Sequence, residues 1–247
     1  MNKRYRLIMG KNCIREVLRL DPERIVEVRT CQRSKADPLY VELLNSNIPI
    51  REVSKKELAQ LVQSESHQSY VAAVRERGQP GIKSFLEEST EKSTSVVVML
   101  DSIYDPQNLG TILRAGECFG VDLVVYSKNR GVDITPVVSK ASSGATELVS
   151  IVKVSNLAET MKLFQEAGYW AVCAEAGEGS QSVFEFQFPE KTLLVLGSEG
   201  EGIQQILRKK SDFSVKIPML GKIDSLNVSQ AAAVFLSSYR RQWNKHA

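Results

Sequence analysis

The 247-residue sequence predicts an α/β protein with a small N-terminal domain and a larger parallel-sheet domain. Short apolar runs rich in Val, Ile and Leu alternate with segments of helical periodicity, which is typical of a parallel sheet covered by helices on both faces. The segment 79–95, rich in turn-forming and charged residues, separates two regions of different composition. The predicted domains are therefore 1–78 and 96–247, joined by a linker at 79–95 that holds one helical turn.

The region 1–78 is expected to form a small α/β domain. Apolar residues at helical spacing in 14–18 indicate a first helix, and the β-branched run 24–29 indicates a strand. Further helices are predicted at 39–44 and 54–62, and further strands at 48–53 and 70–74.

The region 96–247 contains apolar runs that predict the strands of the larger sheet. These strands are expected at 96–100, 123–126, 170–173, 193–196 and 215–217. Helices are predicted at 109–119, 157–167 and 228–243. The last of these helices is rich in alanine, and its small side chains permit a close neighbour such as a second subunit.

Charge is distributed unevenly along the chain. Residues 1–78 contain 15 Lys and Arg against 10 Asp and Glu, whereas residues 96–247 contain 15 against 16. A basic region beside a near-neutral one suggests that residues 1–78 bind a polyanion and that residues 96–247 contain the reactive site. A basic solvated surface without a nucleic-acid partner is the alternative.

Several classes of protein are disfavoured by composition. The sequence has no run of about 18 apolar residues and no apolar stretch at its start, so a soluble, cytoplasmic protein without a membrane partner is expected. Zinc sites and disulfide frameworks are disfavoured, because there are two histidines and the cysteines form no Cys-x-x-Cys pair. We expect no metal site and four buried, reduced thiols, at Cys13, Cys31, Cys118 and Cys173.

Three polar stretches follow predicted strands, at 105–114, 196–202 and 217–227. Open α/β sheets bind ligands at the carboxyl ends of their strands, so these stretches are candidate site segments. Together they offer amides, carboxylates, hydroxyls and a guanidinium, but no histidine and no thiol. Their chemistry must therefore rest on positioning and hydrogen bonding.

The first stretch predicts a helix that starts at Leu109. Pro106 fixes its own φ, and Asn108 is well suited to cap this helix. Arg114 lies at the edge of the apolar stripe of the helix, so it can project towards the ligand edge of the sheet. The alternative is a capping asparagine and a surface arginine without further function.

The second stretch, 197–202, is a glycine turn with two carboxylates. It lacks the Gly-Lys-Ser/Thr ending of a P-loop, and its glycine spacing does not fit a dinucleotide fingerprint. Its carboxylates would repel a phosphate. A turn whose backbone closely approaches a neutral or cationic ligand fits better.

The third stretch is the most distinctive of the three. A proline and a glycine break the chain straight after a strand, and 225–229 then leads into the alanine-rich helix. Ser225 and Asn227 alternate with Leu226 and Val228, so polar and apolar side chains are expected to face opposite ways. A helix cap explains one of these polar residues but not the whole stretch.

In this order and at these strand ends, the three stretches resemble the SpoU (TrmH) branch of the SPOUT RNA 2′-O-ribose methyltransferases. Residues 96–247 are similar to the catalytic domain, including the block 143–147. Residues 1–78 look like the ribosomal-protein-like substrate-binding domain of the family, including 67–72, where Ser69 replaces the usual glycine.

The resemblance implies two sets of site residues. The invariant polar positions of the family correspond to Asn108, Arg114, Glu199, Ser225 and Asn227. Its cofactor-binding positions, for S-adenosylmethionine, correspond to Gly197, Ile217 and Leu226.

The implied reaction moves a methyl group from a sulfonium to a ribose 2′-hydroxyl of RNA. Positioning can supply a large part of the acceleration, up to about 7–11 kcal/mol. The proposed base of the family is the arginine that matches Arg114, assisted by an RNA phosphate. Because a guanidinium stays protonated at neutral pH, Arg114 could instead anchor the phosphate and stabilise the developing alkoxide. Asn108, Ser225 and Asn227 would orient ribose and cofactor, and Glu199 would hold neighbouring loops.

The family also implies a C-terminal trefoil knot and a homodimer. A separate N-terminal domain favours the family member that modifies a guanosine of 23S rRNA, because the tRNA guanosine enzymes of the family generally lack such a domain. The RNA partner would be 23S rRNA or a ribosome-assembly intermediate. A tRNA guanosine enzyme and a ribosomal adenosine enzyme stay open as alternatives. A non-catalytic RNA-binding or ribosome-assembly factor is the alternative of another class.

Overall fold

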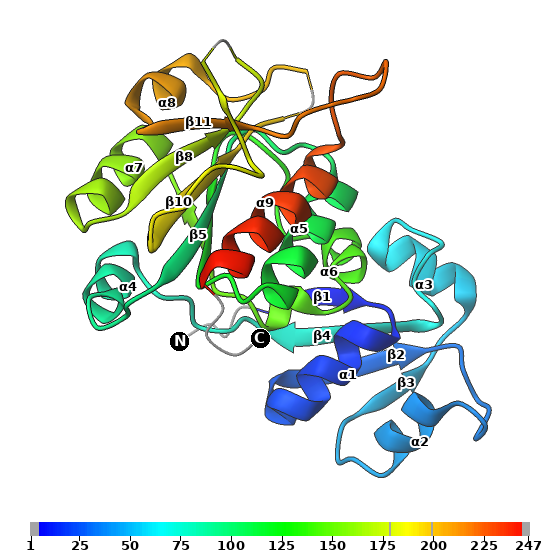
Figure 1. Cartoon of the computed structure of the whole chain (residues 1–247). Coiled ribbons are helices and arrows are strands. Elements are labelled where there is room, and N and C mark those ends of the chain that lie inside the picture. The colour runs from blue at the N-terminus through cyan, green and yellow to red at the C-terminus, as the bar shows by residue number, and fades with distance from the viewer. Residues whose placement is uncertain (1–4, 178, 199, 244–247) are drawn as a thin grey trace. The chain divides into compact units, whose positions relative to one another are not determined.

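The computed structural model describes residues 5–177, 179–198 and 200–243. Contacts between residues divide the chain into two compact units, one formed by 1–78 with 133–148 and the other by 79–132 with 149–247. Figure 1 follows the elements along the chain. The first unit thus contains a segment, 133–148, that the predicted domain 96–247 had included.

The first unit is built on a four-stranded sheet. Its strands, in spatial order, are β1 (Tyr5–Met9), β4 (Tyr70–Arg75), β2 (Ile25–Thr30) and β3 (Ile50–Glu52). Strand β4 is antiparallel to both β1 and β2, and β2 is parallel to β3. One face packs on α1 (Lys11–Leu20) and α2 (Pro38–Leu44), and the other packs on α3 (Lys55–Val62). The predicted elements of 1–78 are confirmed, and β1 had not been predicted.

The segment 133–148 is held in the first unit by a buried carboxylate. It forms α6 (Pro136–Ala141) and a 3-10 turn (Ala145–Glu147). The Glu147 side chain is fully buried and forms ion pairs with Arg6 and Arg24. The Glu147 backbone carbonyl accepts a hydrogen bond from Arg77. A buried carboxylate is tolerated where cations and hydrogen bonds compensate its lost hydration, which explains why this segment packs with distant arginines.

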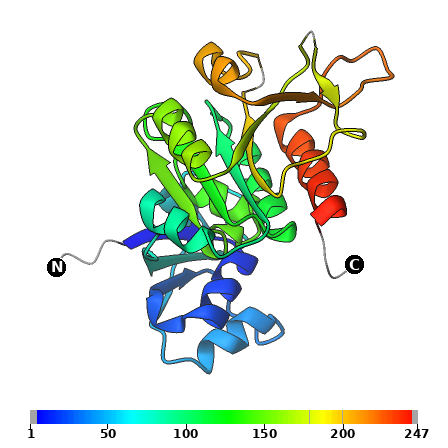
Figure 2. The ribbon, with the colours of Figure 1, turned by 60° about the vertical axis from the view of Figure 1, so that its left-hand side comes forward.

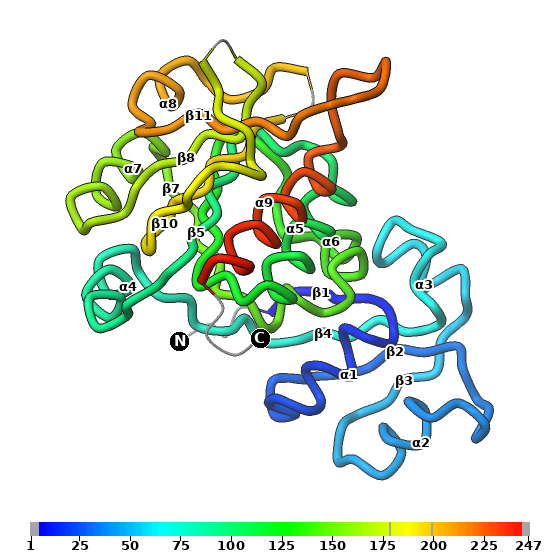
Figure 3. Tube along the Cα trace, in the orientation of Figure 1, coloured from blue at the N-terminus to red at the C-terminus, as the bar shows by residue number. Residues whose placement is uncertain are grey.

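The second unit contains a seven-stranded sheet in which every pair of neighbouring strands is parallel. The spatial order is β7 (Ile151–Val154), β6 (Leu123–Ser127), β5 (Ser95–Leu100), β10 (Lys191–Leu196), β8 (Trp170–Ala174), β11 (Phe213–Lys216) and β9 (Gln181–Ser182). Figure 3 shows that β10, late in the chain, lies between β5 and β8. The five predicted strands are confirmed, whereas β7 and β9 had not been predicted.

Helices cover both faces of this sheet, as predicted. One face packs on α4 (Ile82–Ser89), α7 (Leu157–Glu166) and α8 (Gln205–Lys210). On the opposite side, α5 (Pro106–Cys118) and α9 (Val228–Trp243) pack against each other, as Figures 1 and 2 show. Among the described residues, none of the helices combines the length and apolar character that crossing a membrane requires.

The segment 79–95 differs from the expected linker. It contains the two-turn helix α4, and the Phe85 side chain of this helix is only 6% exposed. Phe85 packs on Phe164 of α7, with 6.1 Å between ring centroids. Burial of this aromatic ring anchors the segment in the second unit.

The cysteines follow the prediction in part. All four are free thiols, and burial raises the pKa of Cys13 to about 12 and the pKa of Cys173 to about 11. Cys118, by contrast, is exposed on α5, and Cys31 is half-buried, so the expectation of four buried thiols was wrong for these two.

The ion pairs of Glu147 predict a large stability effect. Glu147→Ala is expected to lower the free energy of unfolding by about 3–5 kcal/mol, because largely buried guanidinium groups lose their counter-charge. Urea denaturation followed by circular dichroism measures this. The matched control is Glu42→Ala, which removes a half-exposed partner of Arg15 at 3.4 Å and is expected to cost about 0–1 kcal/mol. Equal costs for the two variants would contradict the account.

Candidate functional site

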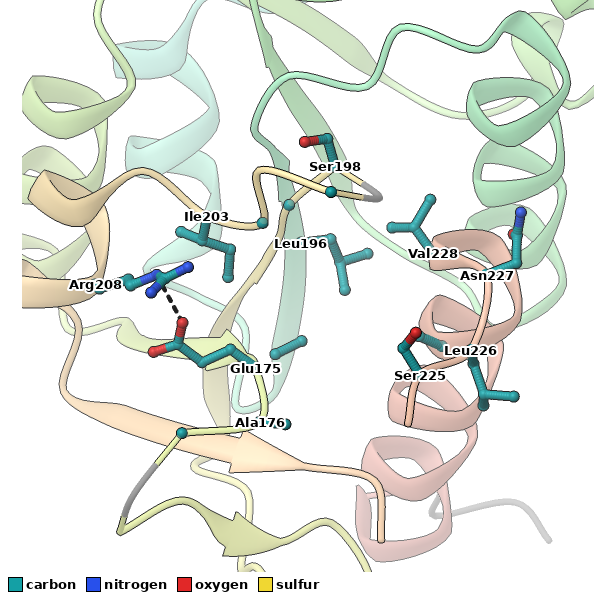
Figure 4. A pocket seen from close by; sticks show the side chains of 16 residues that line it. Glu175, Ala176, Leu196, Ser198, Ile203, Arg208, Ser225, Leu226, Asn227 and Val228 are labelled. Atoms are coloured by element: carbon teal, nitrogen blue, oxygen red, sulfur yellow. Dashed lines mark ion pairs between the residues drawn. The ribbon is translucent and has the colours of Figure 1, made fainter. Parts of the chain in front are cut away.

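A pocket of about 680 Å³ lies at the carboxyl edge of the parallel sheet in the second unit. This volume is typical of small-molecule sites. The walls come from the ends of β8 and β10, the turn after β10 and the loop before α9, as Figure 4 shows. The lining includes Ala174, Glu175, Leu196, Gly197, Ser198, Gly202, Ile203, Arg208, Ser225, Leu226, Asn227 and Val228.

The turn after β10 requires glycine at its first position. A Cβ atom on Gly197 would lie 2.3 Å from the carbonyl carbon of Gly202, so no other residue fits without moving the backbone. Two hydrogen bonds close the turn, from Ser198 N to Gly202 O at 3.2 Å and from Gly202 N to Ser198 O at 3.1 Å. Glu199 lies outside the described residues. The turn therefore presents tightly folded backbone to the pocket, the geometry that the glycine pattern suggested.

The predicted start of the helix after β5 was wrong by one turn. Helix α5 begins at Pro106, and the Asp105 side chain caps it by accepting a hydrogen bond from Gln107 N at 2.9 Å. Aspartate at the N-cap followed by proline at the first helical position is a favourable start, and it leaves Asn108 inside the first turn. Asn108 is 9% exposed and does not cap the helix.

Asn108 is instead joined to the loop that lines the pocket. The side-chain amide of Asn227 donates a hydrogen bond to Asn108 Oδ1 at 2.9 Å. The Asn227 Oδ1 atom accepts from Ser229 N at 2.8 Å and from Ser229 Oγ at 2.6 Å, which caps the start of α9. Asn227 therefore serves both the cap and the link to α5. Ser225 lies on the same loop, and its side chain is exposed at the pocket.

The remaining predicted site residues are placed differently. Gly197 and Leu226 line the pocket, but Ile217 does not; it is half-buried directly after β11. Arg114 is exposed on α5 and is not part of the lining. The structure thus brings together Gly197, Ser225, Leu226, Asn227 and, through a hydrogen bond, Asn108.

Two charged residues of the pocket wall were not predicted. Arg208 Nε of α8 lies 2.7 Å from Glu175 Oε2, and this ion pair faces the pocket in Figure 4. Glu175 comes two residues after the predicted strand 170–173, so the strand-end rule that located the other stretches could have found it. Arg208 gives no comparable signal, because it lies among basic residues on a short helix.

Two family models match the chain. The model described as "SpoU rRNA Methylase family" matches residues 95–237. The model described as "RNA 2'-O ribose methyltransferase substrate binding" matches residues 7–80. Together they cover the larger part of each unit.

Similar proteins agree with these models. The 23S rRNA (guanosine-2'-O-)-methyltransferase RlmB of Vibrio cholerae is 34% identical over 239 residues, which are 96% of this chain and 96% of the relative. RlmB of Yersinia pestis is 35% identical over 96% of this chain and 97% of the relative. The solved structure of the SpoU methyltransferase AviRb from Streptomyces viridochromogenes, in complex with the cofactor AdoMet, shares the fold with a TM-score of 0.78 at 23% identity, over 98% of this chain and 91% of that one.

The two family models span both units of the chain, and the relatives match it over nearly their whole length. These findings confirm the resemblance to the SpoU family that was based on the three polar stretches. The chain therefore belongs to the SpoU rRNA Methylase family.

Proposed function

We propose that this protein transfers a methyl group from S-adenosylmethionine to the ribose 2′-hydroxyl of a guanosine in 23S rRNA. The pocket carries the proposal, because two of the polar stretches line it and the third is tied to it by the Asn227–Asn108 hydrogen bond. The choice of RNA and base rests on relatives that match nearly the whole chain and are named 23S rRNA guanosine-2'-O-methyltransferases.

The residues of the pocket fit S-adenosylmethionine. The tight turn at Gly197 lets a ligand approach the backbone, Leu196 and Ile203 offer apolar contacts, and the Glu175–Arg208 pair offers charge at the wall. Gly197, Leu226 and, at the start of the same loop, Ile217 are the proposed cofactor-binding residues. When bound, this cofactor supplies an electrophilic methyl group on a sulfonium.

The catalytic side chains act mainly by position. Asn108, Ser225 and Asn227 hold the ribose and the cofactor by hydrogen bonds, with the 2′-hydroxyl in line with the methyl group. Glu199 is proposed to hold the neighbouring loops. Correct alignment of two reactants lowers a barrier by up to about 7–11 kcal/mol, which suits a site of amides and hydroxyls.

Arg114 has a separate proposed role towards RNA. Its side chain is exposed and outside the pocket, so it is accessible to a phosphate of the target strand. A guanidinium binds a phosphate through two parallel hydrogen bonds and keeps its charge. Arg114 anchors this phosphate and stabilises the alkoxide that forms as the 2′-hydroxyl loses its proton. Proton removal by Arg114 itself is the competing role.

The N-terminal domain is proposed to bind the RNA. Residues 1–78 contain 15 Lys and Arg against 10 Asp and Glu, and 7–80 match the substrate-binding family model. Such an excess of positive charge attracts the phosphate backbone without reading sequence. The N-terminal domain thus supplies affinity, and the pocket supplies the reaction.

We further propose a cytoplasmic homodimer with a trefoil knot in its C-terminal region. The family resemblance supports the dimer, and the exposed side chains Leu220 and Ile223 offer apolar surface near the pocket loop. The knot is supported by the non-sequential strand order and by the path from β11 at one side of the sheet to α9 beside α5. The proposed ribosomal RNA substrate supports the cytoplasmic location.

The proposal is tested by mapping ribose methylation in 23S rRNA and tRNA from cells with and without the protein. We expect one 2′-O-methylguanosine of 23S rRNA to disappear with the protein. Loss from tRNA, or from an adenosine, would replace the proposed substrate. Unchanged methylation in both pools would refute the enzyme and favour an RNA-binding factor.

Substitution of Arg114 separates its two candidate roles. Arg114→Ala is expected to lower kcat about 100-fold or more and to leave cofactor affinity unchanged, because Arg114 lies outside the pocket. Arg114→Lys keeps the charge and is expected to retain part of the activity with an unshifted pH–rate profile. A shift of this profile to lower pH would indicate proton removal by residue 114, since lysine is the weaker base. Arg241→Ala, at the far end of α9, is the control.

Substitution of Gly197 tests the pocket directly. Gly197→Ala is expected to weaken binding of S-adenosylhomocysteine about tenfold or more, because the new methyl group forces the turn to move. Isothermal titration calorimetry measures the affinity. Gly78→Ala is the control, since a Cβ atom there meets nothing within 4 Å. Normal affinity of Gly197→Ala would refute the assignment of the pocket.

A further inference from the structure

A fully buried carboxylate lies directly beyond β5, next to the pocket but not in its lining. The Oδ2 atom of Asp101 accepts a hydrogen bond from Gln204 N at 2.7 Å, and its Oδ1 atom accepts from Gln204 Nε2 at 2.6 Å. Gln204 immediately follows Ile203, which lines the pocket. Both carboxylate oxygens of Asp101 are therefore bound to the end of the segment that forms the pocket turn.

Asp101 also begins the loop that leads to the proposed catalytic helix. The loop 101–105 ends at Asp105, the N-cap of α5, and α5 carries Asn108 and Arg114. The distance along the chain from Asp101 to Gln204 is 103 residues. The Asp101 carboxylate thus ties the turn of the pocket to the short segment before α5, the helix that carries the Asn108 amide and the Arg114 guanidinium.

The loop is held in a conformation that side-chain-bearing residues seldom adopt. Ser102 has φ +62° and is 1% exposed. Its hydroxyl donates to Asp101 Oδ1 at 2.9 Å and accepts from Arg130 Nε at 3.0 Å. Such backbone geometry persists where surrounding bonds enforce it, and it is often found at functional sites.

The segment 130–132 also contacts the loop 101–105. Val132 N donates to Ile103 O at 2.8 Å, and a Cβ atom on Gly131 would lie 2.8 Å from that oxygen. Arg130 also reaches Glu201 of the pocket turn, at 3.2 Å, although this pair is exposed and contributes less. The buried bonds of Asp101 are the stronger link, because hydrogen bonds to an ionised group in a buried site are strong.

We propose that Asp101 and Gln204 are positioning residues that set the place of Asn108 and Arg114 relative to the cofactor pocket. The inference rests on the proposed function. Asn108 is then held on two sides, by Asn227 from the pocket loop and by the Asp101 clamp through the loop 101–105. Neither Asp101 nor Gln204 lines the pocket, so the clamp acts on catalytic geometry and leaves cofactor affinity to the pocket residues.

The test is Gln204→Leu, which removes the side-chain bond to Asp101 and keeps the backbone bond. A displacement of about 1 Å at a catalytic group costs about 100-fold in rate, so we expect kcat to fall about 10- to 100-fold while the KM for RNA and the affinity for S-adenosylhomocysteine stay within about twofold. Rates are measured on unmethylated 23S rRNA, and protein concentrations are set by calorimetric titration with S-adenosylhomocysteine.

The chain offers a matched control at the amino ends of the strands of the same sheet, opposite the pocket. Gln165 Nε2 donates to Asp212 Oδ2 at 3.0 Å, and this carboxylate also accepts a backbone hydrogen bond, from Ala171 N at 2.8 Å. Gln204 and Gln165 are both half-buried. Gln165→Leu therefore removes a glutamine–aspartate hydrogen bond of the same kind, together with one to Lys210 O, far from the pocket. We expect wild-type kcat.

A second variant keeps the test decisive if Gln204→Leu folds poorly. Ser102→Gly removes the hydroxyl that joins Asp101 to Arg130 and relieves the positive φ, so it is expected to fold and to show reduced kcat with normal cofactor affinity. Wild-type kcat in both variants would overturn the inference, as would a loss of kcat matched by an equal loss of cofactor affinity. Wild-type protein that binds S-adenosylhomocysteine but methylates no RNA would overturn the proposed function and, with it, this inference.

Discussion

The hydrogen bond from Asn227 to Asn108 is the interaction on which the proposed site depends. It joins two residues 119 positions apart in sequence and links the wall of the pocket to the first turn of α5. The parallel sheet makes this meeting possible, because Asn108 follows β5, Asn227 follows β11, and the carboxyl ends of both strands lie at one edge of the sheet. That bond adds a direct polar link between the pocket loop and α5, beside the packing of α5 on α9.

The site is built for alignment and not for strong acid–base chemistry. Its described polar groups are amides, hydroxyls, tightly turned backbone and the Glu175–Arg208 ion pair. The cap at Asn227, the turn at Gly197 and the clamp at Asp101 each fix one segment. Each of these segments arrives from a different part of the chain. Methyl transfer suits such a site, since the cofactor brings an activated methyl group and the protein supplies orientation.

Most of the fold was predictable, because buried parallel strands leave clear apolar runs in the sequence. Strands β1 and β7 were missed, since Arg6 and Lys153 interrupt their apolar character. The helix start at Leu109, with Asn108 as its cap, was predicted wrongly because the cap preference of Asp105 followed by proline outweighed that of Asn108. Contacts between distant residues leave no local signal, which is why the ion pairs of Glu147 were found in the structure alone. The same holds for the pairing of Arg208 with Glu175, although the position of Glu175 at a strand end could have been noticed.

The central claim is that this pocket serves ribose methylation of guanosine in 23S rRNA. The most direct measurement incubates the purified protein with methyl-labelled S-adenosylmethionine and unmethylated 23S rRNA, then digests the RNA and identifies the labelled nucleoside by mass spectrometry. The account predicts label in 2′-O-methylguanosine. Label in another nucleoside, or no labelled RNA from protein that binds S-adenosylhomocysteine, would contradict it.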